Sequence, residues 1–280
     1  MQFEGHIEMN EKTVLVTGAS SGFGKAIAEH FVADGYCVVG TSRSATSDAP
    51  IAASGLTMTG LDVCSEASVD AFITNLKSQG INPDIVVLNA GTAIGGAIED
   101  TPTVDVIAQF ETNVFGVHRL VRHISPMMRT HGFGRFIFIG SIGGRITIPF
   151  QAFYSASKSA LSNCAFALRM ELMPFNVKVS LIEPGDHKTN ISDARTFHGS
   201  DGNSAFEDAA TRAVKVMTVS ERNEASAQSL ALVVKRAAES ANPKVVYIKV
   251  SRTEWLFLFL QKILPDRMFQ NLLMKAYSIG

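Results

Sequence analysis

The sequence predicts an α/β protein built on a doubly wound parallel sheet of seven strands, with helices on both faces. Seven short runs rich in β-branched residues recur along the 280-residue chain, and segments with helical apolar spacing separate them. The runs are nearly continuous in apolar residues, which is typical of parallel strands buried on both faces. Because the helices alternate with the strands, each one can return the chain parallel to the strand before it.

The predicted strands are the β-branched runs at residues 13–17, 37–42, 56–61, 85–89, 135–140, 178–183 and 245–249. The predicted helices are the segments at residues 24–34, 65–79, 104–131, 154–173 and 224–240. This alternation fails between residues 184 and 221, where glycines and polar residues surround one further predicted helix at 206–219. Doubly wound folds place substrate loops after late strands, so we expect a substrate loop at about residues 186–221.

A helical extension is predicted at about residues 252–280. Charged residues interrupt this amphipathic stretch, and Pro265 divides it into two helices. Its most apolar run, residues 255–260, is far shorter than the roughly 20 residues that cross a bilayer. Three roles stay open for the extension: a cover over the domain or a subunit interface, a lid over an apolar pocket, or a patch that rests on a membrane surface.

Composition excludes several classes of protein. Hydrophobic residues make up 46% of the chain and charged residues 18%, which suits one globular domain over residues 1–280. The formal net charge of −1 gives no electrostatic basis for binding nucleic acid. The three cysteines, Cys37, Cys64 and Cys164, lack the spacing of a disulfide framework or a zinc site. We therefore expect no metal site. The first twelve residues lack the features of a signal peptide, so we expect a cytoplasmic protein.

A glycine-rich turn joins the first predicted strand to the first predicted helix. Gly18 permits the tight turn, Gly22 removes a Cβ from the path of a pyrophosphate, and Gly24 lets the helix pack closely. The start of the helix then offers N–H groups and the positive end of its dipole to the phosphates. The motif therefore predicts dinucleotide binding. The other residues of the turn expected at the cofactor are Ser20, Ser21 and Phe23.

The Gly-x-x-x-Gly-x-Gly spacing resembles that of the short-chain dehydrogenases/reductases, which are nicotinamide-dependent enzymes with a Rossmann fold. The resemblance runs from about Lys12 to Lys249. One departure is Leu88, where the family usually has Asn, and we interpret it as a packing substitution. The further matches, in chain order, are Asp62, Val63, Asn89, Ala90, Gly91, Asn113, Ser141, Tyr154, Lys158, Pro184, Gly185 and Thr189.

The resemblance implies a role for each of these matches around the cofactor. Asp62 is expected to contact the adenine, whereas Pro184, Gly185 and Thr189 are expected to meet the nicotinamide carboxamide. The remaining residues that it places around the cofactor are Val63, Asn89, Ala90 and Gly91.

The end of the second predicted strand bears on the choice of nicotinamide cofactor. Members of the family that prefer NAD generally carry an acidic residue there, which binds the ribose 2′-hydroxyl. In this chain Ser42 takes that position and Arg43 follows it. A serine hydroxyl can donate to a 2′-phosphate, and a guanidinium can pair with it through two hydrogen bonds. We therefore expect NADP(H) rather than NAD(H), with a solvated loop charge as the alternative for Arg43.

Four residues match the catalytic positions of the family. Tyr154 and Lys158 are four apart at the start of a predicted helix, so they share one face. A nearby ammonium favours the phenolate form of a tyrosine, which suits Tyr154 for general acid/base chemistry. Ser141 follows a strand and is expected to polarise the substrate oxygen. The resemblance implies that Asn113, inside the predicted helix at 104–131, positions a water that links the lysine to solvent.

We therefore expect an oxidoreductase that transfers hydride between NADP(H) and a carbonyl or secondary alcohol. The alternative is an NADP(H)-binding regulator or scaffold, although such a protein need not keep all four catalytic matches. The family is commonly oligomeric, so a homodimer or homotetramer is expected, built on the predicted helices at 104–131 and 154–173.

The expected substrate-binding segments are residues 143–153, the loop at 186–221 and the C-terminal helices. The first is largely apolar, which favours a hydrophobic steroid- or lipid-like substrate. Asp186, His187 and Lys188 could instead bind a polar group or form a solvated loop. The apolar candidates for the pocket are Ile146, Ile148, Pro149, Phe150, Phe153, Phe197, Phe206, Met217, Trp255, Phe257 and Phe259.

Overall fold

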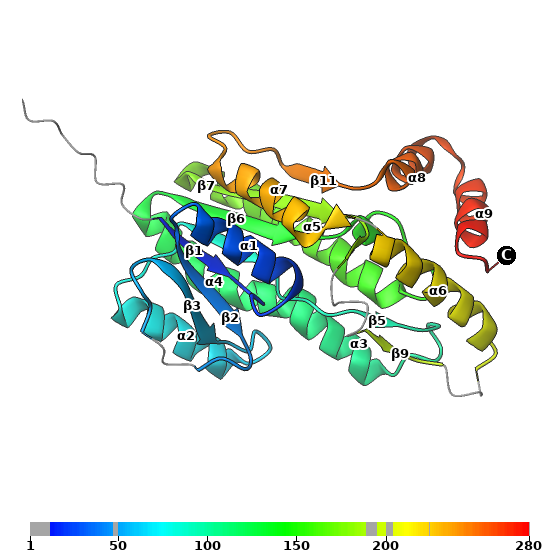
Figure 1. Ribbon diagram of the computed structural model, residues 1–280, viewed down its shortest axis with the longest axis horizontal. Helices are drawn as coiled ribbons and strands as arrows, with labels where there is room; N and C mark the ends of the chain where they lie inside the picture. Colours follow the sequence, from blue (N-terminus) through cyan, green and yellow to red (C-terminus); the bar gives the residue numbers. More distant parts are fainter. Residues whose placement is uncertain (1–11, 47–49, 189–194, 200–203, 224, 280) are drawn as a thin grey trace, which may run out of the picture.

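A computed structural model describes residues 12–46, 50–188, 195–199, 204–223 and 225–279 (Figure 1). A seven-stranded sheet lies at its centre in the order β11-β7-β6-β4-β1-β2-β3, and every neighbouring pair of strands is parallel. This arrangement confirms the predicted doubly wound sheet. Its strands are β1 (Thr13–Val16), β2 (Cys37–Ser42), β3 (Gly55–Gly60), β4 (Ile85–Leu88), β6 (Gly134–Ile139), β7 (Val177–Pro184) and β11 (Val246–Lys249).

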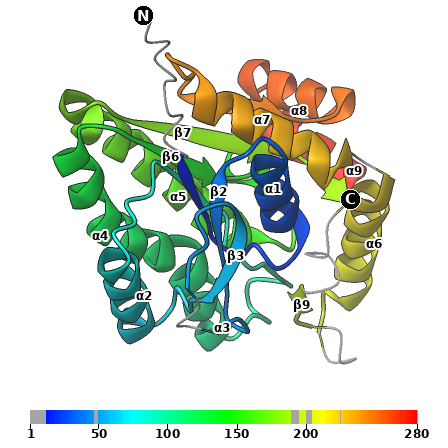
Figure 2. The same cartoon turned by 60° about the vertical axis from the view of Figure 1, so that its left-hand side comes forward.

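Helices cover both faces of the sheet, as Figure 2 shows. One face packs against α2, α4 and α5, and the other packs against α1 and α7. The helix bounds are α1 (Gly22–Ala33), α2 (Glu66–Ser78), α3 (Thr103–Phe110), α4 (Gly116–His131), α5 (Ala152–Leu172), α6 (Glu207–Asn223), α7 (Ala227–Glu239), α8 (Arg252–Ile263) and α9 (Asp266–Ala276).

Successive residues of one strand enter the two different cores. In β1, Leu15 joins the core under α2, α4 and α5, whereas Val14 and Val16 join the core under α1 and α7. All three side chains are fully buried. Because side chains alternate across a strand, burial on both faces requires the continuous apolar runs seen in the sequence.

The predicted helix at 104–131 is not regular. It consists of α3, a π-helical turn at Glu111–Phe115, and α4. A π turn inserts an extra residue into the helical ladder, and such turns occur frequently at functional sites. The predicted span is helical throughout, but the sequence did not indicate the π turn, because residues 111–115 contain neither proline nor glycine.

Some short elements near the carboxyl end of the sheet were not predicted. β5 (Ile94–Gly95) pairs with β9 (Thr196–Phe197), and β8 (His187–Lys188) pairs with β10 (Ala225–Ser226). A 3₁₀ turn at Ile142–Gly144 follows β6. Two-residue pairings carry too little periodicity to be recognised in a sequence.

The predicted pair of C-terminal helices is confirmed, with Pro265 directly before α9. Both helices lie beyond the carboxyl end of the sheet, and α9 lies next to α6 (Figure 1), where Arg212 of α6 donates to the carbonyl oxygen of Ser278 after α9. Leu258 of α8 and Phe269 and Leu273 of α9 form an apolar cluster with Ile146, which follows β6. Within the described residues, no helix combines the length and the hydropathy that spanning a bilayer would require.

Candidate active site

The carboxyl ends of the central strands surround one large cavity, with a volume of about 820 Å³. Its lining includes residues of the glycine turn, the segments after β4, β6 and β7, and the helices α5, α6, α8 and α9. Most of the predicted site residues therefore meet in one place. Gly24 and Asn113 lie behind this lining, and Thr189 lies outside the described residues.

The glycine turn has the backbone that the sequence predicted. Gly18 has φ +67° and Gly22 has φ +54°, a region that side chains disfavour. A Cβ on Gly24 would lie 2.1 Å from the carbonyl oxygen of Gly18 and 2.6 Å from Nδ2 of Asn89. Gly24 therefore permits close packing against the turn itself rather than against the strand. Ser21 precedes α1 without capping it through its side chain, which leaves the first N–H groups of the helix for a ligand.

Asn89 holds the glycine turn from behind. Its Nδ2 donates to the carbonyl oxygens of Thr17 at 2.8 Å and Gly18 at 3.3 Å. The Thr17 hydroxyl accepts from the backbone N–H groups of Asn89 and Ala90, both at 2.9 Å. These bonds join the ends of β1 and β4, so Asn89 shapes the cavity wall with its side chain turned into the protein.

Polar residues gather at the end of the cavity that lies beyond β2 and β3. Ser42 is nearly buried, and its hydroxyl lies 3.3 Å from that of Ser44. Arg43 is exposed and lines the cavity, and no carboxylate among the described residues forms an ion pair with it. Asp62 and Val63 also line the cavity, and the Asp62 carboxylate accepts from the backbone N–H of Cys64 at 3.0 Å.

Asn113 lies in the π turn and is 1% exposed. Its Nδ2 donates to the carbonyl oxygen of Thr92 at 3.0 Å and to Oγ of Ser157 at 3.1 Å. Its Oδ1 accepts from the N–H of Thr92 at 2.9 Å and would lie 3.2 Å from a Cβ on Gly91. Asn113 thus ties the segment after β4 to α5, at the residue directly before Lys158.

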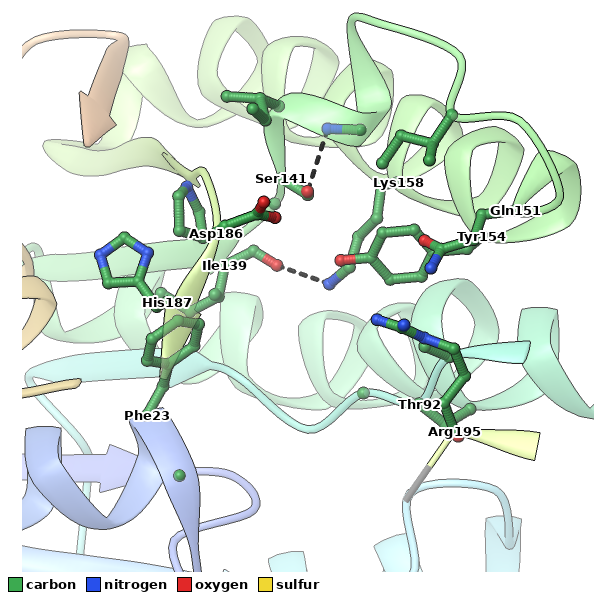
Figure 3. A pocket seen from close by; sticks show the side chains of 18 of the residues that line it. Phe23, Thr92, Ile139, Ser141, Gln151, Tyr154, Lys158, Asp186, His187 and Arg195 are labelled. Carbon is green, nitrogen blue, oxygen red and sulfur yellow. Dashed lines mark hydrogen bonds between the residues drawn. The ribbon is translucent and has the colours of Figure 1, made fainter. Parts of the chain in front are cut away.

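Ser141, Tyr154 and Lys158 face the same part of the cavity (Figure 3). The hydroxyl of Ser141 accepts from the N–H of Gly143 at 3.0 Å. A Cβ on Gly143 would lie 3.3 Å from both Oγ of Ser141 and Cε1 of Tyr154. Because Gly143 has no side chain, Ser141 and Tyr154 can lie close to each other on this wall of the cavity.

Lys158 is buried beside Tyr154. Its Nζ lies 6.0 Å from the centre of the tyrosine ring and donates to the carbonyl oxygen of Ile139 at 2.9 Å. Burial lowers the pKa of Lys158 to about 8, because desolvation disfavours the ammonium form. The site therefore holds a lysine whose charge depends on what enters the cavity.

The part of the cavity next to the C-terminal helices is largely apolar. Ile146 and Ile148 line it from the connection before α5, as predicted, and Met217 and Phe257 line it from α6 and α8. Residues of α9 complete the wall, so the C-terminal helices contribute directly to the cavity. The other apolar candidates lie outside the lining; they are Pro149, Phe150, Phe153, Phe197, Phe206, Trp255 and Phe259.

Sequence reasoning missed Glu254 of α8. One of its carboxylate oxygens accepts from the N–H of Asp186 at 2.6 Å, and the other accepts from the N–H of Ser251 at 2.7 Å. A Cβ on Gly185 would lie 2.1 Å from the Glu254 carboxylate. The Ser-x-x-Glu spacing of a capping box was readable in the sequence. Its contact with the segment after β7 was not, because the two segments meet only through the fold.

Polar residues of the expected substrate-binding segments also line the cavity, among them Gln151, Arg195 and His187, which was considered for binding a polar group. Gln151 and Arg195 lie on the side of Tyr154, whereas His187 lies near Phe23 (Figure 3). His187 is 4% exposed, so a solvated loop is the wrong interpretation for this residue.

The fold and the cavity together define a doubly wound α/β protein with a dinucleotide-binding turn. Comparison with known proteins narrows this class. The family model of the short chain dehydrogenases matches residues 12–198. The chain therefore belongs to the short-chain dehydrogenase/reductase family of oxidoreductases, as the resemblance predicted.

Individual relatives match most of the length of the chain. It is 35% identical over 272 residues to a 3-ketodihydrosphingosine reductase of Bacteroides thetaiotaomicron, an alignment that covers 97% of this chain and 100% of that protein. A short-chain dehydrogenase from Streptomyces avermitilis matches with a TM-score of 0.77 and 29% identity, covering 90% and 93% of the two chains. The closed form of a serine dehydrogenase complexed with NADP+ matches with a TM-score of 0.71 and 25% identity, covering 84% and 93%.

Proposed function

We propose that the protein is an NADP(H)-dependent oxidoreductase that transfers hydride between the nicotinamide and a carbonyl or secondary alcohol of a hydrophobic, lipid-like molecule. One observation carries the proposal: a single cavity connects the glycine turn, the group of Ser141, Tyr154 and Lys158, and an apolar chamber. Such a cavity can hold a dinucleotide at one end and an apolar substrate at the other.

The residues of the turn fit a dinucleotide. The positive φ values of Gly18 and Gly22 and the uncapped start of α1 form a cradle for a pyrophosphate. When bound, NADP(H) supplies the hydride chemistry, while the protein supplies position and charge. Asp62 and Val63 would hold the adenine end, and Pro184, Gly185 and Thr189 would hold the carboxamide.

The catalytic residues have complementary roles in this proposal. The Ser141 hydroxyl binds the substrate oxygen and stabilises the negative charge that develops on it. Tyr154 gives a proton to that oxygen during reduction and takes it back during oxidation. The Lys158 ammonium favours the phenolate of Tyr154 and holds the ribose hydroxyls of the cofactor. Asn113 keeps the segment after β4 in place through Thr92.

The preference for NADP(H) rests on Ser42 and Arg43, which line the cavity where the 2′-phosphate would lie. Fluorescence titration with NADPH and with NADH tests it. We expect tighter binding of NADPH, and we expect Arg43→Ala to weaken NADPH binding about tenfold with little effect on NADH, because one charge-assisted contact is lost.

Lys25→Ala is the matched control for Arg43, since Lys25 is an exposed cation of α1 outside the cavity lining. Equal or tighter NADH binding, with Arg43→Ala indistinguishable from this control, would leave Arg43 as a solvated surface charge.

The substrate class rests on the apolar chamber and is supported by the relative named as a 3-ketodihydrosphingosine reductase. We expect the purified protein to oxidise NADPH with a long-chain ketone of the sphingoid type faster than with small polar aldehydes or sugars. Faster turnover of the small polar compounds would contradict this substrate class while leaving the reaction type intact.

The substitution Tyr154→Phe separates an enzyme from a cofactor-binding regulator or scaffold. It removes the proton donor while keeping the ring, so we expect turnover to fall by at least about 100-fold. NADPH affinity should change little. A variant that keeps the activity of the unmodified protein would exclude Tyr154 as the acid, and absence of turnover by both proteins with NADPH still bound would favour the regulator.

A further inference from the structure

His187 occupies an unusual position at the start of β8. It follows the segment after β7 and is 4% exposed, yet it lines the cavity. Its ring meets that of Phe23 edge to face, with centroids 5.3 Å apart and planes at 80° (Figure 3). Phe23 lies between the two glycines that open α1, so the imidazole reaches the end of the cavity where a pyrophosphate would bind.

The hydrogen bonds of His187 determine its tautomer. Nδ1 lies 3.0 Å from the carbonyl oxygen of Gly185. Since a carbonyl oxygen only accepts, Nδ1 carries a proton and donates to it. The other ring nitrogen, Nε2, is buried and has no hydrogen-bond partner among the described residues. A buried polar atom without a partner costs about 1–3 kcal/mol, which makes it a candidate contact for a ligand.

Titratable residues of several elements line the cavity together with His187; they are Arg43, Asp62, Cys64, Tyr154, Lys158, Asp186, Arg195, Glu254 and Tyr277. Asp186 directly precedes His187, and the Glu254 carboxylate accepts from the N–H of Asp186, so two carboxylates belong to this part of the wall. The Lys158 ammonium is held at the carbonyl oxygen of Ile139. The lining residues of α6, which packs against β8, are Val216, Met217 and Ser220, and none of them titrates. The partner strand β10 contributes Ala225 and Ser226.

We propose that His187 is a cofactor-binding residue whose protonated Nε2 donates to the pyrophosphate, so that the protein takes up a proton when it binds the dinucleotide. The inference rests on the proposed function, because it requires a nicotinamide dinucleotide in the cavity. It adds a cation to a phosphate site that otherwise relies on the N–H groups of the glycine turn and the dipole of α1.

Fluorescence titration of NADPH between pH 6 and pH 8.5 tests the contact. His187→Leu removes the ring nitrogens, whereas His187→Gln keeps a neutral donor that does not titrate. At pH 6 we expect His187→Leu to bind NADPH about tenfold more weakly than the unmodified protein, and we expect the difference to shrink towards pH 8.5. His187→Gln should bind with an affinity between the two and lose the same pH dependence. NADH is titrated in parallel, because the 2′-phosphate of NADPH itself ionises near pH 6.

Calorimetric titration in two buffers with different ionisation enthalpies measures the proton directly. We expect the unmodified protein to take up protons when it binds NADPH or NADH. The number of protons taken up should be smaller for His187→Gln, which has no titrating group at residue 187. His118→Gln is the matched control, since His118 is an exposed histidine of α4 outside the cavity lining. It should behave as the unmodified protein does.

Two results would overturn the inference while leaving the proposed function standing. One is tight cofactor binding with the same affinity and pH profile in His187→Leu and the unmodified protein. The other is weaker binding by His187→Leu at every pH without proton uptake, which would make the ring a neutral acceptor for a carboxamide or hydroxyl donor. If the unmodified protein binds neither NADPH nor NADH, the proposed function itself fails.

Discussion

Lys158 is the residue at which burial and charge conflict most directly. Its side chain is 6% exposed and, among the described residues, its Nζ donates to the carbonyl oxygen of Ile139, so the ammonium is poorly solvated. Burial lowers its pKa from 10.5 to about 8. Below pH 8 both the folded and the unfolded protein carry the charge, and the folded protein bears the full desolvation cost. Between pH 8 and 10.5 only the unfolded chain holds the proton, so the stability of the fold rises with pH across this window.

The substitution Lys158→Met should therefore stabilise the cofactor-free protein at pH 7 while removing its activity. The expected gain in the free energy of unfolding is on the order of 3 kcal/mol, from a pKa difference worth about 1.4 kcal/mol per unit. Urea denaturation at several pH values measures it, and the gap between the two proteins should close between pH 8 and 10.5. Lys25→Met, an exposed control, should change stability little. A variant less stable than the unmodified protein at every pH would contradict the argument.

Leu88 and Asn89 show how neighbouring residues differ in what a sequence reveals. Leu88 is 1% exposed and belongs to the core between the sheet and α2, α4 and α5, which agrees with its interpretation as a packing residue. Asn89 was expected at the cofactor and does line the cavity, but its side chain binds Thr17 and Gly18. A motif identifies the position of such a residue, whereas the hydrogen bonds identify what its side chain does.

At the scale of elements, the glycine turn and α1 form a unit whose spacing is dictated by backbone contact. Gly24 lies in the first turn of α1, where a Cβ would overlap the Gly18 carbonyl at 2.1 Å. The same Cβ would lie 2.6 Å from Nδ2 of Asn89. The Gly18 carbonyl belongs to the backbone and Nδ2 of Asn89 is hydrogen-bonded to the turn, so neither group can move without disturbing the turn. This close approach explains why the third glycine of the motif is needed although its φ is ordinary.

We expect Gly24→Ala to lower the free energy of unfolding by about 1–3 kcal/mol, the usual cost of overpacking, and to weaken NADPH binding because the turn is displaced. Chemical denaturation and fluorescence titration measure the two effects. Gly80→Ala is the control: Gly80 has φ +69° but no atom within 4 Å of an added Cβ. It should cost about 1 kcal/mol and leave NADPH affinity unchanged. Equal effects of both substitutions on NADPH affinity would contradict the role of Gly24.

The helical segment before α5 shows where element prediction stops. Its apolar spacing predicted helix over residues 104–131, and helix is present on both sides of the π turn. The turn at Glu111–Phe115 depends on the hydrogen bonds of Asn113 to Thr92 and Ser157, which come from other elements. Local spacing cannot report bonds of this kind, so sequence reasoning found the residue without its geometry.

At the scale of the whole molecule, the C-terminal helices have two different faces. Phe257 and Leu273 line the cavity, whereas the exposed side of α8 carries Trp255 at 59%, Phe259 at 45% and Ile263 at 57% exposure. The same two helices carry exposed cationic side chains; they are Arg252 and Lys262 of α8 and Arg267 and Lys275 of α9. An apolar helix face with cationic neighbours is suited to a membrane surface that carries anionic lipids.

We expect the full-length protein to sediment with vesicles that contain anionic phospholipid, and a version ending at Val250 to remain in the supernatant. Because the truncation also opens the cavity, Trp255→Ser/Phe259→Ser provides a second test on exposed side chains only. This double variant should lose most vesicle binding and keep its NADPH affinity. If the full-length protein stays in the supernatant with both anionic and neutral vesicles, the membrane contact is wrong.

The family resemblance implies a homodimer or homotetramer built on the predicted helices at 104–131 and 154–173, and this stays a prediction. The exposed residues Met170 at 67% and Met173 at 65%, at the end of α5, are available for such an interface. Light scattering of the purified protein measures its mass directly.

The order of strands and helices, the parallel sheet and the dinucleotide-binding turn were all determined by the sequence. These features depend on spacing between residues close together in the chain: apolar periodicity, three glycines, and a tyrosine four residues before a lysine. Only the tertiary structure decided that Glu254 meets Asp186 across 68 residues, that α8 and α9 line the cavity, and that His187 is buried against Phe23. Such contacts join segments far apart in the chain, and they are set by how the helices pack at the carboxyl end of the sheet.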